Sequence, residues 1–325
     1  DDGSAGNQFA LGEVGVIDLA SGLPLTIRHR VVLPRVAPGT PVAGWLLTQE
    51  LSGRSTCVNQ PGGADDGSPA ARVLCASGLG LSPETPGVMT RALSVPDGVD
   101  VTPAVVLRPT PGDGLDALLR TPTTVRATGA SEVNDPRGSS QAAVDGDPGT
   151  VWTAAEPTKK GDKPTLTLTL PAPQEVQSLR IVAPAGGYPA APTEVAVDLG
   201  TGPQRVHVGA DGVIRLRPAV TDRITLTMLD RTDLLDVNSL GFASRAPVGI
   251  ADITISPAPP AAPPLSRPID IGCDAGIGIT VSGQVIGLSV HTTAAALRDG
   301  EPVVARPCSS APIRLPAGEQ ELSVN

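Results

Sequence analysis

An acidic turn near the middle of the chain holds the side chains best suited to bind a ligand. Residues 145–150 read Asp-Gly-Asp-Pro-Gly-Thr. Asp-Gly and Pro-Gly are turn dipeptides, because glycine accepts positive φ, proline fixes φ and aspartate bonds to the backbone that follows it. Calcium takes about six to eight oxygen ligands, and such a turn offers carboxylate and carbonyl oxygens together. Asp145, Asp147 and Thr150 therefore predict either a calcium site or a metal-free turn whose aspartates accept hydrogen bonds from backbone N–H groups.

Two groups of loop residues could contact a carbohydrate. Tyr188 is the only tyrosine and lies in the Gly-, Ala- and Pro-rich segment 185–192. If its ring is exposed it could lie against the apolar face of a sugar, and simple packing of the loop is the alternative. Asn134, Asp135 and Arg137 precede the acidic turn and could exchange hydrogen bonds with hydroxyl groups, although solvated loop residues are the plainer interpretation. Aromatic residues make up 2% of the chain, so we expect any glycan binding to be weak and to depend on polar side chains.

Catalytic motifs are missing from the sequence. It contains no Gly-x-Ser-x-Gly, His-Glu-x-x-His or phosphate-binding Walker pattern. His29, His207 and His291 are far apart, and each falls in or beside a predicted strand. Two carboxylates could in principle act as a glycosidase pair, but no spacing singles out such a pair. We therefore expect this stretch of chain not to be catalytic.

The four cysteines predict two local disulfide bonds. None of them has the close spacing of a zinc or redox site. Cys57 would pair with Cys75 and Cys273 with Cys308, and each bond would contribute about 3 to 4 kcal/mol in the loop-entropy description. Such bonds would indicate an oxidising, extracytoplasmic location. The alternative is four buried free thiols.

Charge and hydropathy exclude two further classes of protein. The net charge is −9 and the isoelectric point is about 4.8, whereas nucleic-acid binding requires clustered Lys and Arg. No window approaches the roughly 18 consecutive apolar residues of a membrane helix. The N-terminal residues lack the basic and apolar regions of a signal peptide. We expect either a mature secreted protein or a soluble piece of a larger one.

Composition and periodicity predict an all-β protein. Gly 37 and Pro 35 occur beside a hydrophobic fraction of 40% and a mean hydropathy of +0.08, which suits short strands joined by tight turns and is too apolar for disorder. Residues 165–170 alternate threonine and leucine, so one face should be buried. We expect antiparallel β-sandwich modules, with Trp152 filling the core of the middle one, and a short helix at 113–120.

The chain divides into three segments at changes in composition. Residues 1–120 predict a β-rich, sandwich-like domain, and 121–257 predict a second sandwich. Residues 258–325 begin with a proline-rich spacer and continue into a β-rich tail. That tail is either a truncated third module or the completion of the first domain's sheet, which would make the middle domain an insertion.

The acidic turn and the strands around it carry a family resemblance. The pattern Ala-Val-Asp-Gly-Asp-x-x-Thr-x-Trp at 143–152, followed by the alternating strand, resembles the discoidin, or coagulation factor 5/8 type C, family. That family includes many carbohydrate-binding modules. Residues 248–255 are similar to its closing strand, where a glutamate is usual and this chain has Asp252. The resemblance covers 121–257 and implies a galactose-binding-like jelly roll.

The resemblance also implies a ligand set for a structural calcium ion. The loop ligands would be Asp145, Asp147 and Thr150, and the closing strand would supply Asp252. Its side chain is one methylene shorter than that of the usual glutamate.

The layout of the whole chain, with its Arg-, Ala-, Pro- and Gly-rich composition, resembles the extracytoplasmic region of the mycobacterial membrane arabinofuranosyltransferases of the AftD kind. This implies a non-catalytic portion that binds cell-wall arabinan weakly and adjoins the membrane-embedded part of its parent. No catalytic residue of that parent can be assigned here. The alternative is a purely structural scaffold that contacts other domains.

Overall fold

The structure is a computed structural model. It describes residues 16–21, 24–25, 30–48, 51–52, 57–61, 71–75, 82–83, 89–133, 135–159, 161–237 and 242–324. Asn134, one of the candidate carbohydrate contacts, lies outside these stretches.

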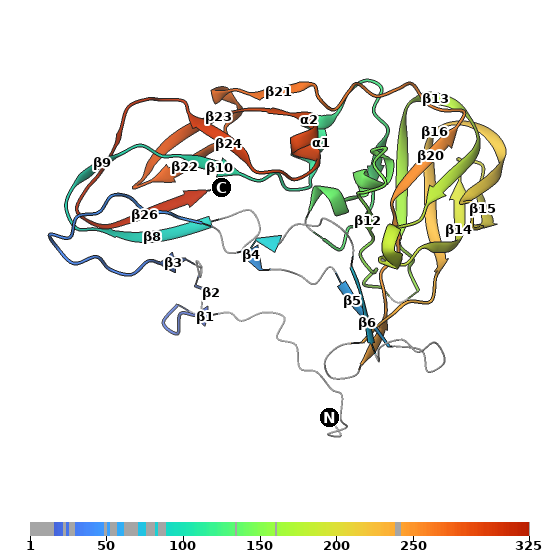
Figure 1. Cartoon of the computed structure of the whole chain (residues 1–325), viewed down its shortest axis with the longest axis horizontal. Helices are drawn as coiled ribbons and strands as arrows, with labels where there is room; N and C mark the ends of the chain where they lie inside the picture. Colours follow the sequence, from blue (N-terminus) through green and yellow to red (C-terminus); the bar gives the residue numbers. More distant parts are fainter. Residues whose placement is uncertain are drawn as a thin grey trace.

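The described strands form two β-sandwiches that meet at two short helices (Figure 1). The helices are α1 (Asp113–Leu119), as predicted, and α2 (Ala294–Arg298). Within the described residues, no helix combines the length and hydrophobicity that a membrane crossing requires.

The flanking domain is built on one large sheet and one strand pair. The sheet has the order β10-β24-β23-β22-β26-β8-β3, with β21 joined to β23. Its strands are β3 (Val31–Val32), β8 (Met89–Val95), β10 (Val105–Leu107), β21 (Pro268–Ile271), β22 (Gly278–Val281), β23 (Gln284–Thr293), β24 (Val303–Pro307) and β26 (Gly318–Val324). The pair is β9 (Val99–Val101) with β25 (Ile313–Leu315), and the short helix η4 is Cys273–Ala275. Both sheets contribute to one apolar core.

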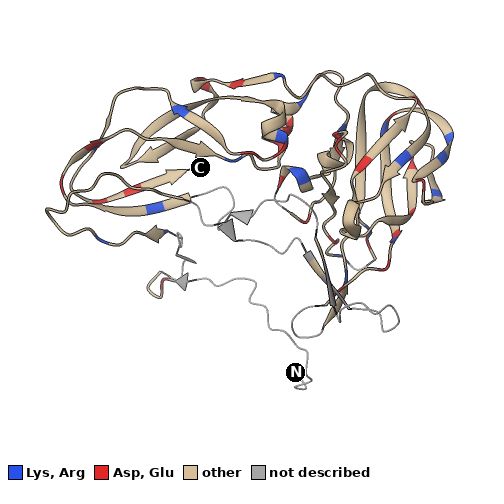
Figure 2. Ribbon diagram, in the orientation of Figure 1, with Lys and Arg blue, Asp and Glu red and all other residues tan. Residues whose placement is uncertain are grey.

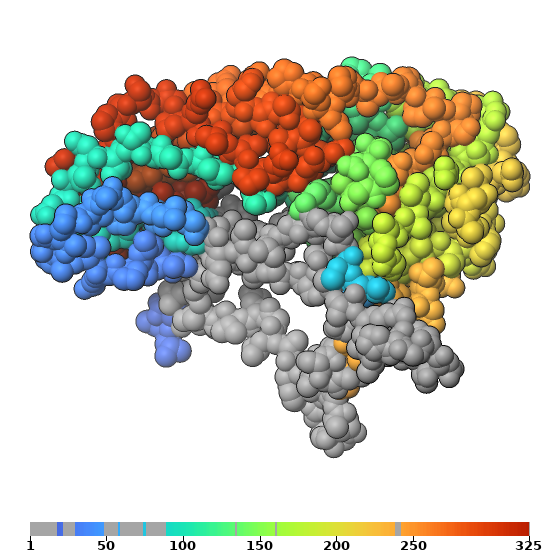
Figure 3. Space-filling view, in the orientation of Figure 1, coloured from blue at the N-terminus to red at the C-terminus, as the bar shows by residue number. Residues whose placement is uncertain are grey.

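The flanking domain is assembled from both ends of the chain. β8, β9 and β10 precede the middle domain, and they pair with β26, β25 and β24, which follow it. Figure 3 shows the later segments lying against the earlier ones in this domain. The tail therefore completes the sheet that the first segment begins, and the middle domain is an insertion.

The inserted domain, called the module below, is the second sandwich. Its main sheet has the order β11-β13-β16-β14-β15, with β20 also paired to β13. The strands are β11 (Arg126–Thr128), β13 (Thr165–Val182), β14 (Pro192–Asp198), β15 (Pro203–His207), β16 (Val213–Arg231) and β20 (Asp252–Ser256). A second layer holds β12 (Trp152–Thr153) paired with β19 (Gly249–Ile250), η1 (Pro136–Gly138) and η2 (Ser140–Val144).

The module's core follows the predicted alternation. Leu166, Leu168 and Leu170 are buried while the threonines between them are not. Trp152 is fully buried and packs in the same core, as expected for a ring placed between the turn and a strand. The indole Nε1 donates to the Ala130 carbonyl at 3.3 Å, so burial leaves its N–H satisfied.

The remaining described elements are short. They are β1 (Val16–Ile17), β2 (Pro24–Leu25), β4 (Leu51–Ser52), β5 (Cys57–Pro61), β6 (Ala71–Cys75), β7 (Ser82–Pro83), η3 (Ala185–Gly187), β17 (Leu235–Val237) and β18 (Ala243–Arg245). The hairpin β5–β6 does not join the flanking sheet. It packs against β17 and η3 of the module.

Candidate functional site

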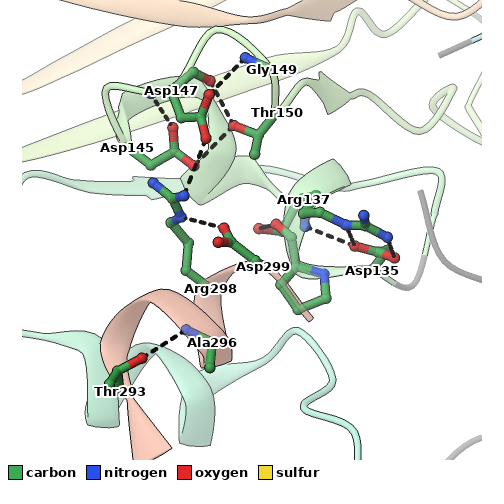
Figure 4. Close-up of polar contacts among 12 residues, drawn as sticks. Asp135, Arg137, Asp145, Asp147, Gly149, Thr150, Thr293, Ala296, Arg298 and Asp299 are labelled. Carbon is green, nitrogen blue, oxygen red and sulfur yellow. Dashed lines mark hydrogen bonds and ion pairs between the residues drawn. The ribbon is translucent and has the colours of Figure 1, made fainter. Parts of the chain in front are cut away.

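The acidic turn bonds largely to itself (Figure 4). Asp145 Oδ1 accepts from the backbone N–H of Asp147 at 2.9 Å, and Asp147 Oδ1 accepts from the N–H of Gly149 at 2.9 Å. Thr150 Oγ1 lies 2.9 Å from both Asp145 Oδ2 and the Asp147 carbonyl oxygen. These are the bonds of a turn closed by its own aspartates.

Arg298 extends from α2 of the flanking domain to this turn (Figure 4). Its Nη2 donates to Asp147 Oδ2 at 3.1 Å, and its Nε donates to Asp299 Oδ1 at 2.7 Å. The arginine side chain is 14% exposed and that of Asp147 is 40% exposed. Burial acts to lower the pKa of Arg298, but the bond to Asp299 and the charges of Asp145 and Asp147 outweigh it and raise the pKa. A cation from one domain therefore neutralises an acidic turn of the other.

Asp145 is the most perturbed carboxyl of the turn. Burial raises its pKa to about 7, against the opposing effects of the Asp147 N–H, Thr150 and Arg298. A threonine hydroxyl has one proton, so it cannot donate to both of its neighbours at once. When Asp145 is protonated, its O–H can donate to Thr150 Oγ1, whose own proton then goes to the Asp147 carbonyl. The neutral acid thus satisfies the whole network.

Asp252 lies at the start of β20, beside the turn. Burial raises its pKa, the N–H groups of Ile253 and Gly146 lower it, and the charge of Asp147 raises it. The structure therefore brings all four predicted calcium ligands to one corner of the module. Within the described part of the chain, no three His, Cys, Asp or Glu side chains are grouped to hold a metal ion.

The oxygens of this corner are already engaged. Each carboxyl oxygen of Asp145 and Asp147 has a hydrogen-bond partner in the protein, and a calcium ion bound to Asp147 Oδ2 would have to displace Arg298. The calcium site stays a prediction.

Asp135 and Arg137 bind each other. Arg137 donates from Nε and Nη2 to the two carboxylate oxygens of Asp135 at 3.1 and 3.0 Å, and its backbone N–H donates to Oδ1 at 2.9 Å. Asp135 is 6% exposed. The expectation of solvated loop residues was wrong for Asp135, because this carboxylate caps η1 and is buried in doing so.

Tyr188 is not displayed to solvent. It is 6% exposed and packs with Val58, Ala190, Leu234 and Ala246. The condition for sugar stacking is not met, because the hairpin β5–β6, from a distant part of the sequence, packs against this loop. The alternative of loop packing is the arrangement found.

The cysteines are placed in pairs. Cys273 and Cys308 are joined by a disulfide bond with a Cα–Cα distance of 5.9 Å. Cys75 is also disulfide-bonded, and Cys57 lies directly opposite it in the hairpin. The first bond ties η4 to the end of β24 beside Gly287.

Arg298 is the residue of this site that the sequence analysis missed. The sequence did carry a signal for the helix that holds it, because Thr293 is a favoured N-cap residue. In the structure Thr293 caps α2 by accepting a hydrogen bond from the Ala296 N–H at 3.2 Å. That signal marks the helix, but it does not reveal that the side chain meets Asp147, 151 residues away.

Replacing Arg298 should weaken the junction. Arg298→Met keeps an unbranched apolar side chain but leaves Asp147 and the buried Asp145 without their cation. We expect the free energy of unfolding to fall by about 1 to 3 kcal/mol, less than for a fully buried pair because water screens Asp147. Urea denaturation measures the change. Arg245→Met, which removes an exposed pair with Asp230, is the matched control, and an equal effect of both substitutions would contradict the assignment.

The pH dependence of stability should carry a contribution from Asp145. Its folded pKa lies above its unfolded value, so the folded state holds the proton more tightly. This group stabilises the fold fully below pH ~4, and its contribution is lost as the pH rises to ~7. Between these two pH values the folded state should bind up to about one more proton than the unfolded state, and Asp145→Asn should remove this difference. Thermal denaturation of both proteins with chelator present tests this, and parallel profiles would contradict it.

Comparison with known proteins shows which proteins the chain is similar to. Residues 122–266 match the family described as arabinofuranosyltransferase D, third carbohydrate binding module. Over 100% of its length the chain is 42% identical to the alpha-(1->3)-arabinofuranosyltransferase of Mycobacterium tuberculosis and 43% identical to that of Mycolicibacterium smegmatis, and it spans 24% and 23% of these proteins. It also matches the solved structure of arabinofuranosyltransferase AftD from mycobacteria with 38% identity and a TM-score of 0.67, over 96% of this chain and 24% of that one. The chain is thus similar to a segment of the AftD arabinofuranosyltransferases, and its residues 122–266 match the carbohydrate-binding module described for these proteins.

Proposed function

We propose that the chain is a non-catalytic, glycan-binding part of a membrane arabinofuranosyltransferase that assembles cell-wall arabinan. The match of residues 122–266 to a carbohydrate-binding module carries this proposal. Identity of about two residues in five along the whole chain to arabinofuranosyltransferases supports the choice of parent. The ligand would be arabinan of the arabinogalactan and lipoarabinomannan pathway. The other partner would be the membrane-embedded part of the parent.

We expect the binding to be weak and polar. Trp152 and Tyr188 are both buried, so neither ring is available to stack on a sugar. Figure 2 shows acidic and basic residues interspersed over both domains, and charged or polar side chains are the groups left to bond to hydroxyls. The Cys273–Cys308 bond supports an oxidising, extracytoplasmic location.

Titration with arabinan oligosaccharides tests the function. Chemical shifts or binding heat should change saturably at about millimolar ligand, as expected of a site without stacking rings. An unrelated oligosaccharide such as a mannan fragment is the control. No response at millimolar arabinan, with or without calcium, would contradict the proposal.

We propose further that the acidic turn is metal-free and that Arg298 supplies the positive charge that calcium supplies in the resembling family. The contacts of Arg298 with Asp147, and its effect on Asp145, support this. A guanidinium also brings directed N–H donors, which suit a carboxylate whose other oxygen is already bonded.

Metal analysis distinguishes the two alternatives for the turn. After treatment with chelator, and then dialysis against calcium, the protein should hold no stoichiometric ion, and its melting temperature should be the same in both buffers. One calcium per chain, with a calcium-dependent rise in melting temperature, would overturn the metal-free turn and restore the calcium site.

A structural scaffold is the second candidate. The burial of Tyr188 under Val58 of the hairpin favours it, as does the mutual pairing of Asp135 and Arg137. Under this alternative the module serves to hold other parts of the parent in place and shows no response to arabinan.

A further inference from the structure

A cavity of about 410 Å³ lies where the module meets the flanking domain. β11 and β20 form one side of it. Both pair with the same edge of β13, β11 along its first half and β20 along its second. The spacer 258–263, the end of α1 with the segment 120–124, the acidic corner at 141–146, and residues 265, 267 and 298 form the remaining walls. The cavity is therefore made by the insertion itself and is absent from either domain taken alone. Its volume is in the range of ligand sites, roughly 300 to 1,000 Å³.

The charges around the cavity nearly balance. Three aspartates and four arginines line it, among them Asp116, Arg126, Asp252 and Arg298. Apolar surface from Leu119, Ile253 and Pro259 separates them. Alternating acceptors, donors and apolar surface suit a neutral polyhydroxyl ligand, because hydroxyl groups both donate and accept while ring carbons contact apolar walls. An anion would meet the carboxyl groups of Asp116, Asp145 and Asp252 as well as the arginines.

Arg126 presents a donor that the protein leaves unused. Its Nε is buried, and within the described residues it has no hydrogen-bond partner. Ala127 beside it points into the module's core, so Arg126 lies on the outer face of the sheet, toward the cavity. A buried N–H without an acceptor is rare and calls for an explanation, and a ligand hydroxyl supplies one.

Asp116 stands near this donor. Burial raises the pKa of its carboxyl, and the charge of Arg126 acts in the opposite direction. A donor and an acceptor, both withdrawn from bulk water, therefore face the same cavity.

We propose that this cavity binds one or two residues of a neutral furanose oligosaccharide, with Arg126 donating to and Asp116 accepting from its hydroxyl groups. This proposal rests on the proposed glycan-binding function and gives that function a binding site. The site is separate from the Tyr188 loop and from the loop that holds Asp135.

Binding of arabinan oligosaccharides to the full chain and three variants tests the site. Arg126→Met removes the donor and keeps an apolar side chain. Thr254→Tyr places a ring in the cavity from an exposed position on β20. Arg223→Met is the matched control. Thr169 of β13 pairs with Arg126 on one side and with Arg223 on the other, so the two arginines lie on the same face of the sheet. Arg223 is exposed and does not line the cavity. Thermal denaturation confirms that each variant is folded.

Arg126→Met should weaken binding about tenfold or more, Thr254→Tyr should abolish it and Arg223→Met should leave it unchanged. Equal affinity in all four proteins would overturn the site while the glycan-binding function stands. No binding to the unaltered chain would overturn both. Binding of inorganic phosphate that depends on Arg126, without binding of oligosaccharide, would overturn the assignment of a neutral sugar.

Discussion

The ion pair between Arg298 and Asp147 constrains how the two sandwiches meet. A guanidinium that is largely buried must have its charge met, and the available carboxylates come from both domains: Asp299 from its own, Asp147 and Asp145 from the module. Separation of the domains would return these groups to water but would also expose the apolar surface around them. Because burial of charge offsets much of the Coulombic gain, the pair selects an orientation more than it adds stability.

Two further arginines connect the chain segments that come before and after the module. Arg267 donates from Nη2 to the carbonyls of Leu118 and Leu119 at the end of α1, at 3.1 and 2.8 Å. Arg108 donates to the Gly300 carbonyl at 3.1 Å. Arginines thus satisfy carbonyls at helix ends that have no partner within the helix. Both contacts lie within the flanking domain, so they hold together the two segments between which the module is inserted.

Sequence periodicity and turn chemistry predicted the features that depend only on residues close together in the chain. The alternation at 165–170 predicted the buried leucines of β13, and the turn chemistry of 145–150 predicted the self-bonded loop, with the calcium question left open. The sequence did not reveal contacts between residues far apart in the chain. The ring of Tyr188 is covered by Val58, and Asp147 meets Arg298, because separate segments fold together. No local pattern records which residue will cover which.

The cavity follows from the same topology. β11 and β20 share one edge of β13. The other edge of β11 is bonded by the side chains of Ser140 and Gln141, whereas among the described residues the other edge of β20 pairs with no strand. An open edge must be covered or it invites pairing with another strand. The segment that crosses this region is Pro-Ala-Pro-Pro-Ala-Ala-Pro-Pro at 257–264. Proline has no N–H to give to a strand ladder, so this spacer can cover the edge without adding to the sheet. A covering that does not pair leaves space between itself and the strands. In a module where the rings of Trp152 and Tyr188 are packed in the interior, that space is where buried polar groups remain for a ligand.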